Sequence, residues 1–218
     1  MNKKQISKFH YLTQDGIANA NHVQLAHEAC EAGIKWIQLR IKISYPYSET
    51  EKIKLTSIAY EVKNICQKYN TTLIINDFVD IARQVNADGV HLGKNDMSVT
   101  DARKILGNDI IIGGTANTFD DILKLTNEGV NYIGLGPFKF TSTKKNISPV
   151  LGIEGIKNIV EKCNQNNIYI PIIAIGGITL EDVSSILNTK VFGFAVSGAI
   201  NQSDDRATAI KNFRNLIQ

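Results

Sequence analysis

Polar side chains that could bind a ligand stand at alternating positions near the end of one apolar run. The run WIQLRIK, residues 36–42, carries Gln38, Arg40 and Lys42. Alternate residues of a strand share one face, and two cations on a face that looks into a protein are costly unless an anion accompanies them. We therefore expect Arg40 and Lys42 to bind an anionic substrate; the alternative is that both are simply exposed at the strand end.

Carboxylates follow the next two apolar runs. Asp77 comes directly after TLIIN (72–76), and Asp96 follows GVHLG (89–93). A pair of carboxylates from neighbouring strand ends suits a hydrated Mg2+ that also contacts a substrate phosphate. The alternative is that Asp77 caps the following helix and Asp96 caps a turn. His91, alone within its short run, is expected to be a buried, hydrogen-bonded packing residue rather than a ligand.

The stretch YIGLGPFKFTSTKKN, residues 132–146, begins as an apolar run and continues as a polar loop. Its hydroxyl residues offer neutral hydrogen-bond donors, and Lys144 adds a compact positive charge that suits phosphate oxygens. The hydroxyl residues are Thr141, Ser142 and Thr143. We expect this loop to face the substrate; the alternative is a solvated surface loop.

The elements that must position these residues follow from the apolar pattern. Eight apolar runs of strand length alternate with segments of helical spacing, which predicts an α/β protein with a parallel sheet covered by helices. Eight such units in 218 residues favour a single-domain (β/α)8 TIM barrel spanning residues 1–218. The alternative, an open doubly wound sheet, lacks support because no G-x-G-x-x-G follows the first run. The predicted strands are 9–14, 36–42, 72–76, 89–93, 109–116, 131–137, 169–177 and 192–198.

Small residues end the last two apolar runs. Gly176 and Gly177 close the seventh run, and Ser197 and Gly198 close the eighth. Glycine lets backbone amides approach an oxyanion closely, and phosphate sites of such barrels are frequently built from the loops after strands seven and eight. The two pairs predict a phosphate-bearing substrate; the alternative for either pair alone is a tight turn.

Composition narrows the classes of function. The chain has 24 Lys and Arg against 21 Asp and Glu, a formal net charge of +3, and no basic patch interleaved with aromatic residues that would indicate nucleic acid. No apolar segment has the length of a signal peptide or a membrane span. We expect a cytoplasmic protein with small-molecule substrates and neither nucleic acid nor membrane as a partner; a homo-oligomer stays open. Cys30, Cys66 and Cys163 form no C-x-x-C pair and are expected to be reduced packing residues.

Several short motifs occur in a characteristic order along the chain: Q-L-R-x-K, I-N-D, H-L-G-x-x-D, G-P-x-x-x-T-x-T-K and A-I-G-G-I, followed by a small-residue loop. On these motifs the chain resembles the thiamine phosphate synthase family from Tyr11 to about Ile200. The resemblance implies a transferase of thiamine biosynthesis. Such an enzyme joins 4-amino-2-methyl-5-hydroxymethylpyrimidine diphosphate to a thiazole ethyl phosphate, or its carboxylated form, and makes thiamine phosphate and pyrophosphate.

The resemblance also implies a role for each matched residue. Asp77 and Asp96 would bind Mg2+, and pyrophosphate would depart before the thiazole nitrogen attacks. The pyrimidine diphosphate would be held by Gln38, Arg40, Lys42, Asn76, Thr115 and Lys144. The catalytic residues would be the cations that stabilise the leaving group, Arg40, Lys42 and Lys144. The thiazole phosphate would be held by Thr141, Ser142, Thr143, Gly177, Ser197 and Gly198.

Two other functions fit parts of this pattern. A thiazole tautomerase shares the barrel and the thiazole phosphate but not the diphosphate chemistry. This chain keeps Asp77, and it has Pro137 where the resemblance places the catalytic His of the tautomerase. A non-catalytic barrel that binds a phosphate ligand is the other alternative, and the complete set of charged residues argues against it.

Overall fold

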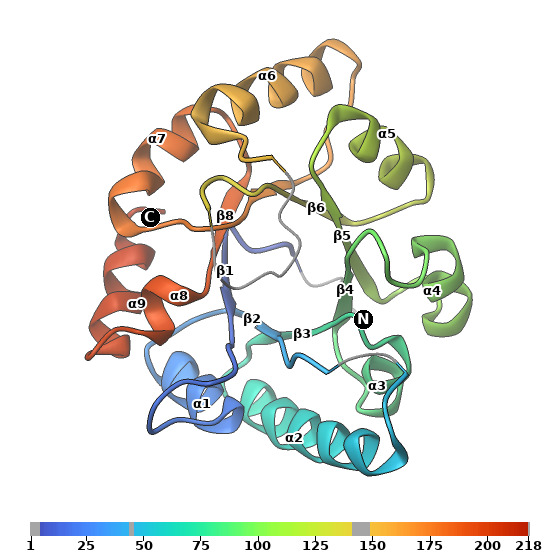
Figure 1. Ribbon diagram of the computed structural model, residues 1–218, viewed down its shortest axis with the longest axis vertical. Coiled ribbons are helices and arrows are strands. Elements are labelled where there is room, and N and C mark those ends of the chain that lie inside the picture. Colours follow the sequence, from blue (N-terminus) through green and yellow to red (C-terminus); the bar gives the residue numbers. More distant parts are fainter. Residues whose placement is uncertain (1–4, 44–45, 141–148, 218) are drawn as a thin grey trace.

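The apolar runs form parallel strands that pair in sequence order, and β8 pairs with β1, so that the eight strands close into a barrel. The computed structural model describes residues 5–43, 46–140 and 149–217. Helices form a ring outside the strands (Figure 1). The predicted single-domain (β/α)8 barrel is confirmed. The strands are β1 (Phe9–Leu12), β2 (Trp36–Leu39), β3 (Thr72–Asn76), β4 (Gly89–Leu92), β5 (Ile111–Ala116), β6 (Tyr132–Leu135), β7 (Ile172–Ala174) and β8 (Gly193–Val196).

A helix follows each strand, and several helices begin where the sequence provides a capping residue. Asn21, Ser48 and Thr118 each accept a hydrogen bond from the backbone three residues on and form capping boxes, which satisfy amides that the first helical turn leaves unpaired. The helices in the described residues are α1 (His22–Glu31), α2 (Glu49–Lys68), α3 (Val79–Gln84), α4 (Val99–Leu106), α5 (Phe119–Asn127), α6 (Gly152–Gln165), the 3-10 helix η1 (Leu180–Asp182), α7 (Val183–Asn188), α8 (Gly198–Asn201) and α9 (Arg206–Asn215).

All the strands except β3 are shorter than the sequence predicts, and β2 and β7 show the physical reasons. The second predicted strand runs to residue 42, but β2 ends at Leu39, because the amides of Arg40 and Lys42 bond to side chains instead of to a neighbouring strand. The seventh predicted strand spans 169–177, but β7 covers only Ile172–Ala174. Before β7, Pro171 has no amide hydrogen to donate to a strand ladder. After β7, Gly176 and Gly177, with φ of 96° and 68°, bend the chain out of the sheet.

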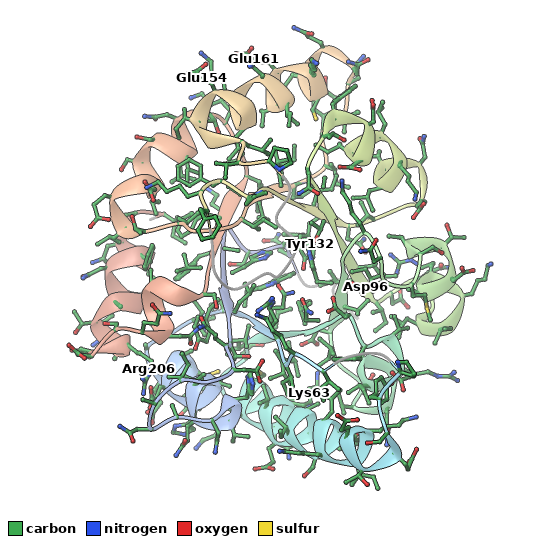
Figure 2. All side chains as sticks on the ribbon, viewed as in Figure 1. Lys63, Asp96, Tyr132, Glu154, Glu161 and Arg206 are labelled. Atoms are coloured by element: carbon green, nitrogen blue, oxygen red, sulfur yellow. The ribbon has the colours of Figure 1, made fainter. Side chains whose placement is uncertain are left out.

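The main hydrophobic core lies between the outer faces of the strands and the inner faces of the helices. The three cysteines are buried and free, as predicted for packing residues. The charged side chains of α6 lie on the side away from this core. For example, Glu154 and Glu161 project outward from this helix (Figure 2). Of the helices in the described residues, none is both long and apolar enough to cross a membrane.

A second, smaller core fills the inside of the barrel. His10 stacks on Trp36 with 4.3 Å between ring centroids, and it meets the edge of Tyr132 at 5.1 Å. Burial lowers the pKa of His10 to about 3, so this ring is neutral and acts as packing material at neutral pH. Gly113 makes room for Tyr132, since a Cβ atom at Gly113 would lie 2.2 Å from Tyr132 Cζ. Three buried rings, of His10, Trp36 and Tyr132, therefore fill the inside of the barrel.

Candidate active site at the carboxyl ends of the strands

A cavity of about 160 Å³ lies at the carboxyl ends of the strands, above the aromatic rings. Tyr132 and Asp96, both labelled in Figure 2, belong to its wall. The sequence-predicted residues that line it are Gln38, Arg40, Asn76, Asp77, Asp96 and Thr115. The closed barrel thus brings together these six residues, which span 77 positions of the chain from Gln38 to Thr115.

The side-chain amides of Gln38 and Asn76 form a pair on one wall of this cavity. Both are buried, and Gln38 Nε2 donates to Asn76 Oδ1 over 2.7 Å. With the amides in this orientation, the Gln38 Oε1 acceptor and the Asn76 Nδ2 donor are the groups left to bond a ligand. Adjacent strands hold the two residues, with Gln38 of β2 level with Ile74 of β3, so the donor and acceptor are fixed before a ligand arrives.

Arg40 brings a half-buried positive charge to the same cavity. Burial lowers the pKa of the Arg40 guanidinium, and the nearby carboxylates of Asp77 and Asp15 raise it by less; an arginine nevertheless stays protonated at any physiological pH. Lys42 differs from the expectation of a shared inward face, because it is exposed and is not part of the cavity wall. The alternation stops with β2 at Leu39, which explains why Lys42 does not follow Gln38 and Arg40 inward.

Asp77 and Asp96 lie on the wall of this one cavity. Asp77 has a φ of 66°, an uncommon conformation for a residue with a side chain. It is not the capping residue of α3, because that position is Phe78, where no side chain bonds the helix amides. Asp96 accepts a hydrogen bond from the Gly93 amide at 2.6 Å, so it does close a turn, as the alternative interpretation has it, and it reaches the cavity as well.

The donor set at Asp77 and Asp96 limits the kind of metal ion that could bind there. In residues 5–43, 46–140 and 149–217 there is no group of three or more His, Cys, Asp and Glu that could hold a metal. An ion at this cavity would take two carboxylates from the described chain and would need water or ligand oxygens for its other positions. Mg2+ is commonly held in this manner, together with substrate phosphates, whereas a closed structural zinc site needs four protein ligands.

His91 connects two walls of the cavity. It is buried and hydrogen-bonded, as predicted, with Nδ1 3.0 Å from the Tyr132 hydroxyl and Nε2 3.0 Å from Thr115 Oγ1. Burial raises the pKa of Tyr132 above its usual value, so its hydroxyl keeps its proton. The bonds to His91 fix the direction of the Thr115 hydroxyl, which lines the cavity. His91 also lines the cavity. The sequence predicts only its packing role.

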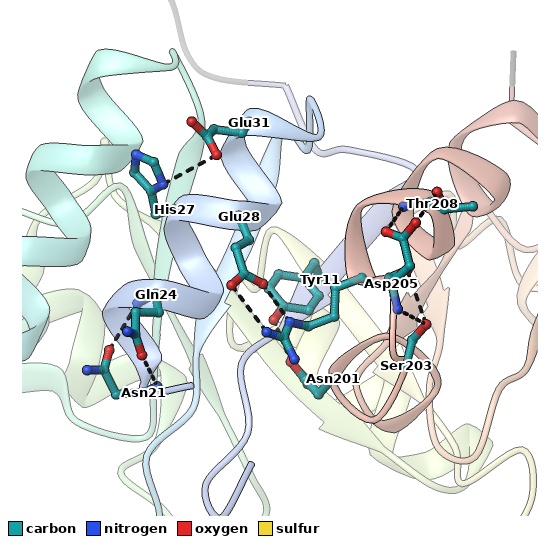
Figure 3. A network of polar contacts seen from close by, with 11 residues as sticks. Tyr11, Asn21, Gln24, His27, Glu28, Glu31, Asn201, Ser203, Asp205 and Thr208 are labelled. Atoms are coloured by element: carbon teal, nitrogen blue, oxygen red, sulfur yellow. Dashed lines mark hydrogen bonds and ion pairs between the residues drawn. The ribbon is translucent and has the colours of Figure 1, made fainter. Parts of the chain in front are cut away.

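The residues predicted to bind a phosphate lie beside this cavity, after β7 and β8, and do not line it. Ser197 Oγ donates to Gln14 Oε1 at 3.3 Å and accepts from Asn201 Nδ2 at 3.1 Å. Asn201 is in turn held by the Tyr11 hydroxyl, at 2.5 Å, in the network drawn in Figure 3. A Cβ atom at Gly198 would meet nothing closer than 3.9 Å, so the backbone there is open to a ligand.

The predicted loop residues Thr141, Ser142, Thr143 and Lys144 lie outside the residues that the structure describes. The two ends of this loop are described. The Phe138 amide donates to the Ile175 carbonyl at 2.8 Å, and the Leu151 amide donates to the Pro137 carbonyl at 2.9 Å. Both ends are therefore held beside the turn after β7.

Several residues near the cavity are absent from the sequence prediction. Thr13 and Asp15, directly after β1, accept hydrogen bonds from the amides of Arg40 and Lys42, and His22 bonds to both of them. The polar run T-Q-D at the end of the first predicted strand was the available signal. Only its position at a strand end distinguishes it from an ordinary polar turn.

Comparison with known proteins finds relatives over almost the whole chain. A sequence profile of the family described as thiamine monophosphate synthase matches residues 9–200. The chain is 46% identical over 211 residues to the thiamine-phosphate synthase of Flavobacterium johnsoniae, covering 97% of this chain and 96% of that protein. It is 48% identical over 191 residues to the thiamine-phosphate synthase of Phocaeicola vulgatus, covering 88% and 89%. The solved structure of thiamine phosphate pyrophosphorylase from Pyrococcus furiosus is similar with a TM-score of 0.83 at 30% identity, covering 96% of this chain and 95% of that one.

Proposed function

The chain belongs to the thiamine monophosphate synthase family, and from this premise we propose that it joins 4-amino-2-methyl-5-hydroxymethylpyrimidine diphosphate to a thiazole ethyl phosphate, with release of pyrophosphate. Its relatives are named for the synthesis of thiamine phosphate, which makes the protein a transferase whose substrates are small molecules. The observation that carries the finer proposal is the lining of one cavity by an amide pair, an arginine and two carboxylates.

The Gln38–Asn76 pair suits an aminopyrimidine. Such a ring has an amino group that donates hydrogen bonds next to a ring nitrogen that accepts one. The Gln38 oxygen would accept from the amino group, and the Asn76 Nδ2 group would donate to the ring nitrogen. Because the two amides bond each other at 2.7 Å, neither can rotate without losing that bond, and the Thr115 hydroxyl offers a further contact on the opposite wall.

The diphosphate would extend from the pyrimidine toward Arg40. A guanidinium offers several donors in a planar fork that matches phosphate oxygens, and Lys42 and Lys144 would add two more positive charges to the same group. Asp77 and Asp96 would hold Mg2+. When bound, this ion neutralises charge on the diphosphate and on the departing pyrophosphate.

The chain's own residues would act by stabilising charge. The bond between the pyrimidine methylene carbon and the diphosphate oxygen breaks, and both electrons leave with pyrophosphate, whose growing charge Arg40, Lys42 and Lys144 stabilise. The cation left on the pyrimidine is stabilised by its amino group, which Gln38 orients. The thiazole nitrogen then forms the new carbon–nitrogen bond with its lone pair, so that no side-chain nucleophile is required.

The thiazole phosphate would bind on the side of β7 and β8. The backbone amides around Gly177 and Gly198 and the hydroxyl of Ser197 would hold its phosphate, with the hydroxyls of Thr141, Ser142 and Thr143 added from the loop after β6. The open space over Gly198, where a Cβ atom would meet nothing closer than 3.9 Å, supports this placement.

A single assay tests the proposal. The purified protein is mixed with both substrates and Mg2+, and pyrophosphate and thiamine phosphate are measured over time, with reactions that omit each substrate as controls. We expect equal amounts of the two products, formed only when both substrates are present. Isomerisation of the thiazole without any consumption of diphosphate would instead identify a tautomerase, and binding without turnover would identify a non-catalytic barrel.

A further inference from the structure

The segment that carries Arg40 and Lys42 follows the end of β2 at Leu39. The β1–β2 ladder pairs Leu12 with Gln38 and ends with the Thr13 amide donating to the Gln38 carbonyl at 3.1 Å. Beyond that point two side chains replace the ladder. The Arg40 amide donates to Thr13 Oγ1 at 3.0 Å, and the Lys42 amide donates to Asp15 Oδ2 at 2.9 Å.

His22 joins these two acceptors from the first turn of α1. Its Nδ1 lies 2.8 Å from Thr13 Oγ1, and its Nε2 lies 3.0 Å from Asp15 Oδ1. A carboxylate only accepts, so Nε2 carries a hydrogen. Thr13 Oγ1 thus accepts from the Arg40 amide and is hydrogen-bonded to His22 Nδ1 as well. Thr13 is fully buried, with 0% exposure.

Charge holds the same arrangement together. Burial raises the pKa of the Asp15 carboxyl, but the hydrogen bonds from His22 and the Lys42 amide, and the charge of Arg40, lower it by more. Asp15 is therefore ionised at neutral pH. Its charge in turn acts on the Arg40 guanidinium, so Asp15 contacts the backbone of this segment and attracts its arginine.

We propose that Thr13, Asp15 and His22 are positioning residues that set the backbone carrying Arg40 and Lys42 in the place where a diphosphate binds. The inference rests on the proposed function. None of the three residues lines the cavity, so they act through Arg40 and Lys42 and not by contact with the substrate. Removing the hydrogen-bonded partners of metal-ligating residues typically costs about 10-fold to 100-fold in metal affinity or activity, and we expect an effect of similar size on diphosphate binding here.

The test measures binding of inorganic pyrophosphate with Mg2+ by calorimetry, which needs no turnover. Thr13→Val removes the hydroxyl at nearly constant volume, Thr13→Ser keeps it, and Asp15→Ala removes a carboxylate from a half-exposed position. We expect Thr13→Val and Asp15→Ala to bind pyrophosphate about 10-fold more weakly or worse, and Thr13→Ser to bind like the native protein. The KM for the thiazole phosphate should change little in all three.

Asp205→Ala is the matched control. Asp205 caps α9 and accepts from the Thr208 amide at 2.9 Å (Figure 3), so this variant also loses an exposed carboxylate that accepts hydrogen bonds, without touching the segment after β2. Asp205→Ala should bind pyrophosphate like the native protein, even if its unfolding temperature falls as far as that of Asp15→Ala.

The outcomes separate this inference from the proposed function. If Arg40→Ala loses pyrophosphate binding while Thr13→Val and Asp15→Ala keep native affinity, the positioning role is wrong and the diphosphate site stands. If Asp205→Ala weakens binding as much as Asp15→Ala, the effect is one of general stability and the positioning role is again wrong. If the native protein binds no pyrophosphate at all, both the diphosphate site and the positioning role are refuted.

Discussion

Removal of the Arg40 guanidinium should lower turnover by about 100-fold without weakening the fold. One preorganised group that stabilises transition-state charge typically contributes about 10²–10³ to kcat, or about 3–4 kcal/mol. The expected effect on the unfolding temperature follows from the surroundings of Arg40. Burial lowers the pKa of its guanidinium by more than Asp77 and Asp15 raise it, so burying this cation costs free energy that the two carboxylates do not fully offset. Arg40→Ala removes that cost, and we expect an unfolding temperature equal to or above that of the native protein.

The assay follows pyrophosphate release at saturating diphosphate, with thermal unfolding recorded by circular dichroism. Arg40→Lys keeps the charge but loses the planar fork, so its turnover should fall between those of Arg40→Ala and the native protein. Arg83→Ala, on the exposed face of α3, makes the same truncation outside the site and should keep native turnover. Near-native turnover of Arg40→Ala would refute the assigned role, and a lower unfolding temperature would refute the argument from burial.

Three further predictions concern the phosphate side, the metal and the barrel interior. Gly198→Asp should raise the KM for the thiazole phosphate far more than that for the diphosphate, because it places a carboxylate against the phosphate; an equal loss for both substrates would instead indicate a damaged scaffold. Asp77→Asn and Asp96→Asn should each lower kcat and raise the Mg2+ concentration that gives half-maximal rate, with partial recovery at high Mg2+; native Mg2+ titration curves for both would remove the metal role. Gly113→Ala should lower the free energy of unfolding by about 1–3 kcal/mol, since its Cβ atom would lie 2.2 Å from Tyr132 Cζ; an unchanged denaturant midpoint would show that the Tyr132 ring can move.

The sequence by itself determined the order of the strands and the end of the barrel where the polar residues meet. Apolar runs of strand length are a local signal, and parallel strands joined by helices bring all their carboxyl ends to one face. For this reason Gln38, Arg40, Asp77 and Asp96 could be predicted to lie together, although the sequence alone could not decide between a ligand-binding and a capping role for Asp77. The structure puts all four on the wall of one cavity and gives the capping position of α3 to Phe78.

Only the tertiary structure decided how those residues are held. The amide of Arg40 bonds to a side chain 27 positions earlier, and His91 bonds to the Tyr132 hydroxyl 41 positions later. Such contacts depend on the register between strands and on closure of the barrel, which no local pattern encodes. The amides of Arg40 and Lys42 bond to Thr13 and Asp15 beyond the end of β2 at Leu39, and Lys42 is exposed, against the alternation that the sequence predicts. A strand stops where its amides find better acceptors, and here those acceptors are side chains that only the folded barrel brings within reach.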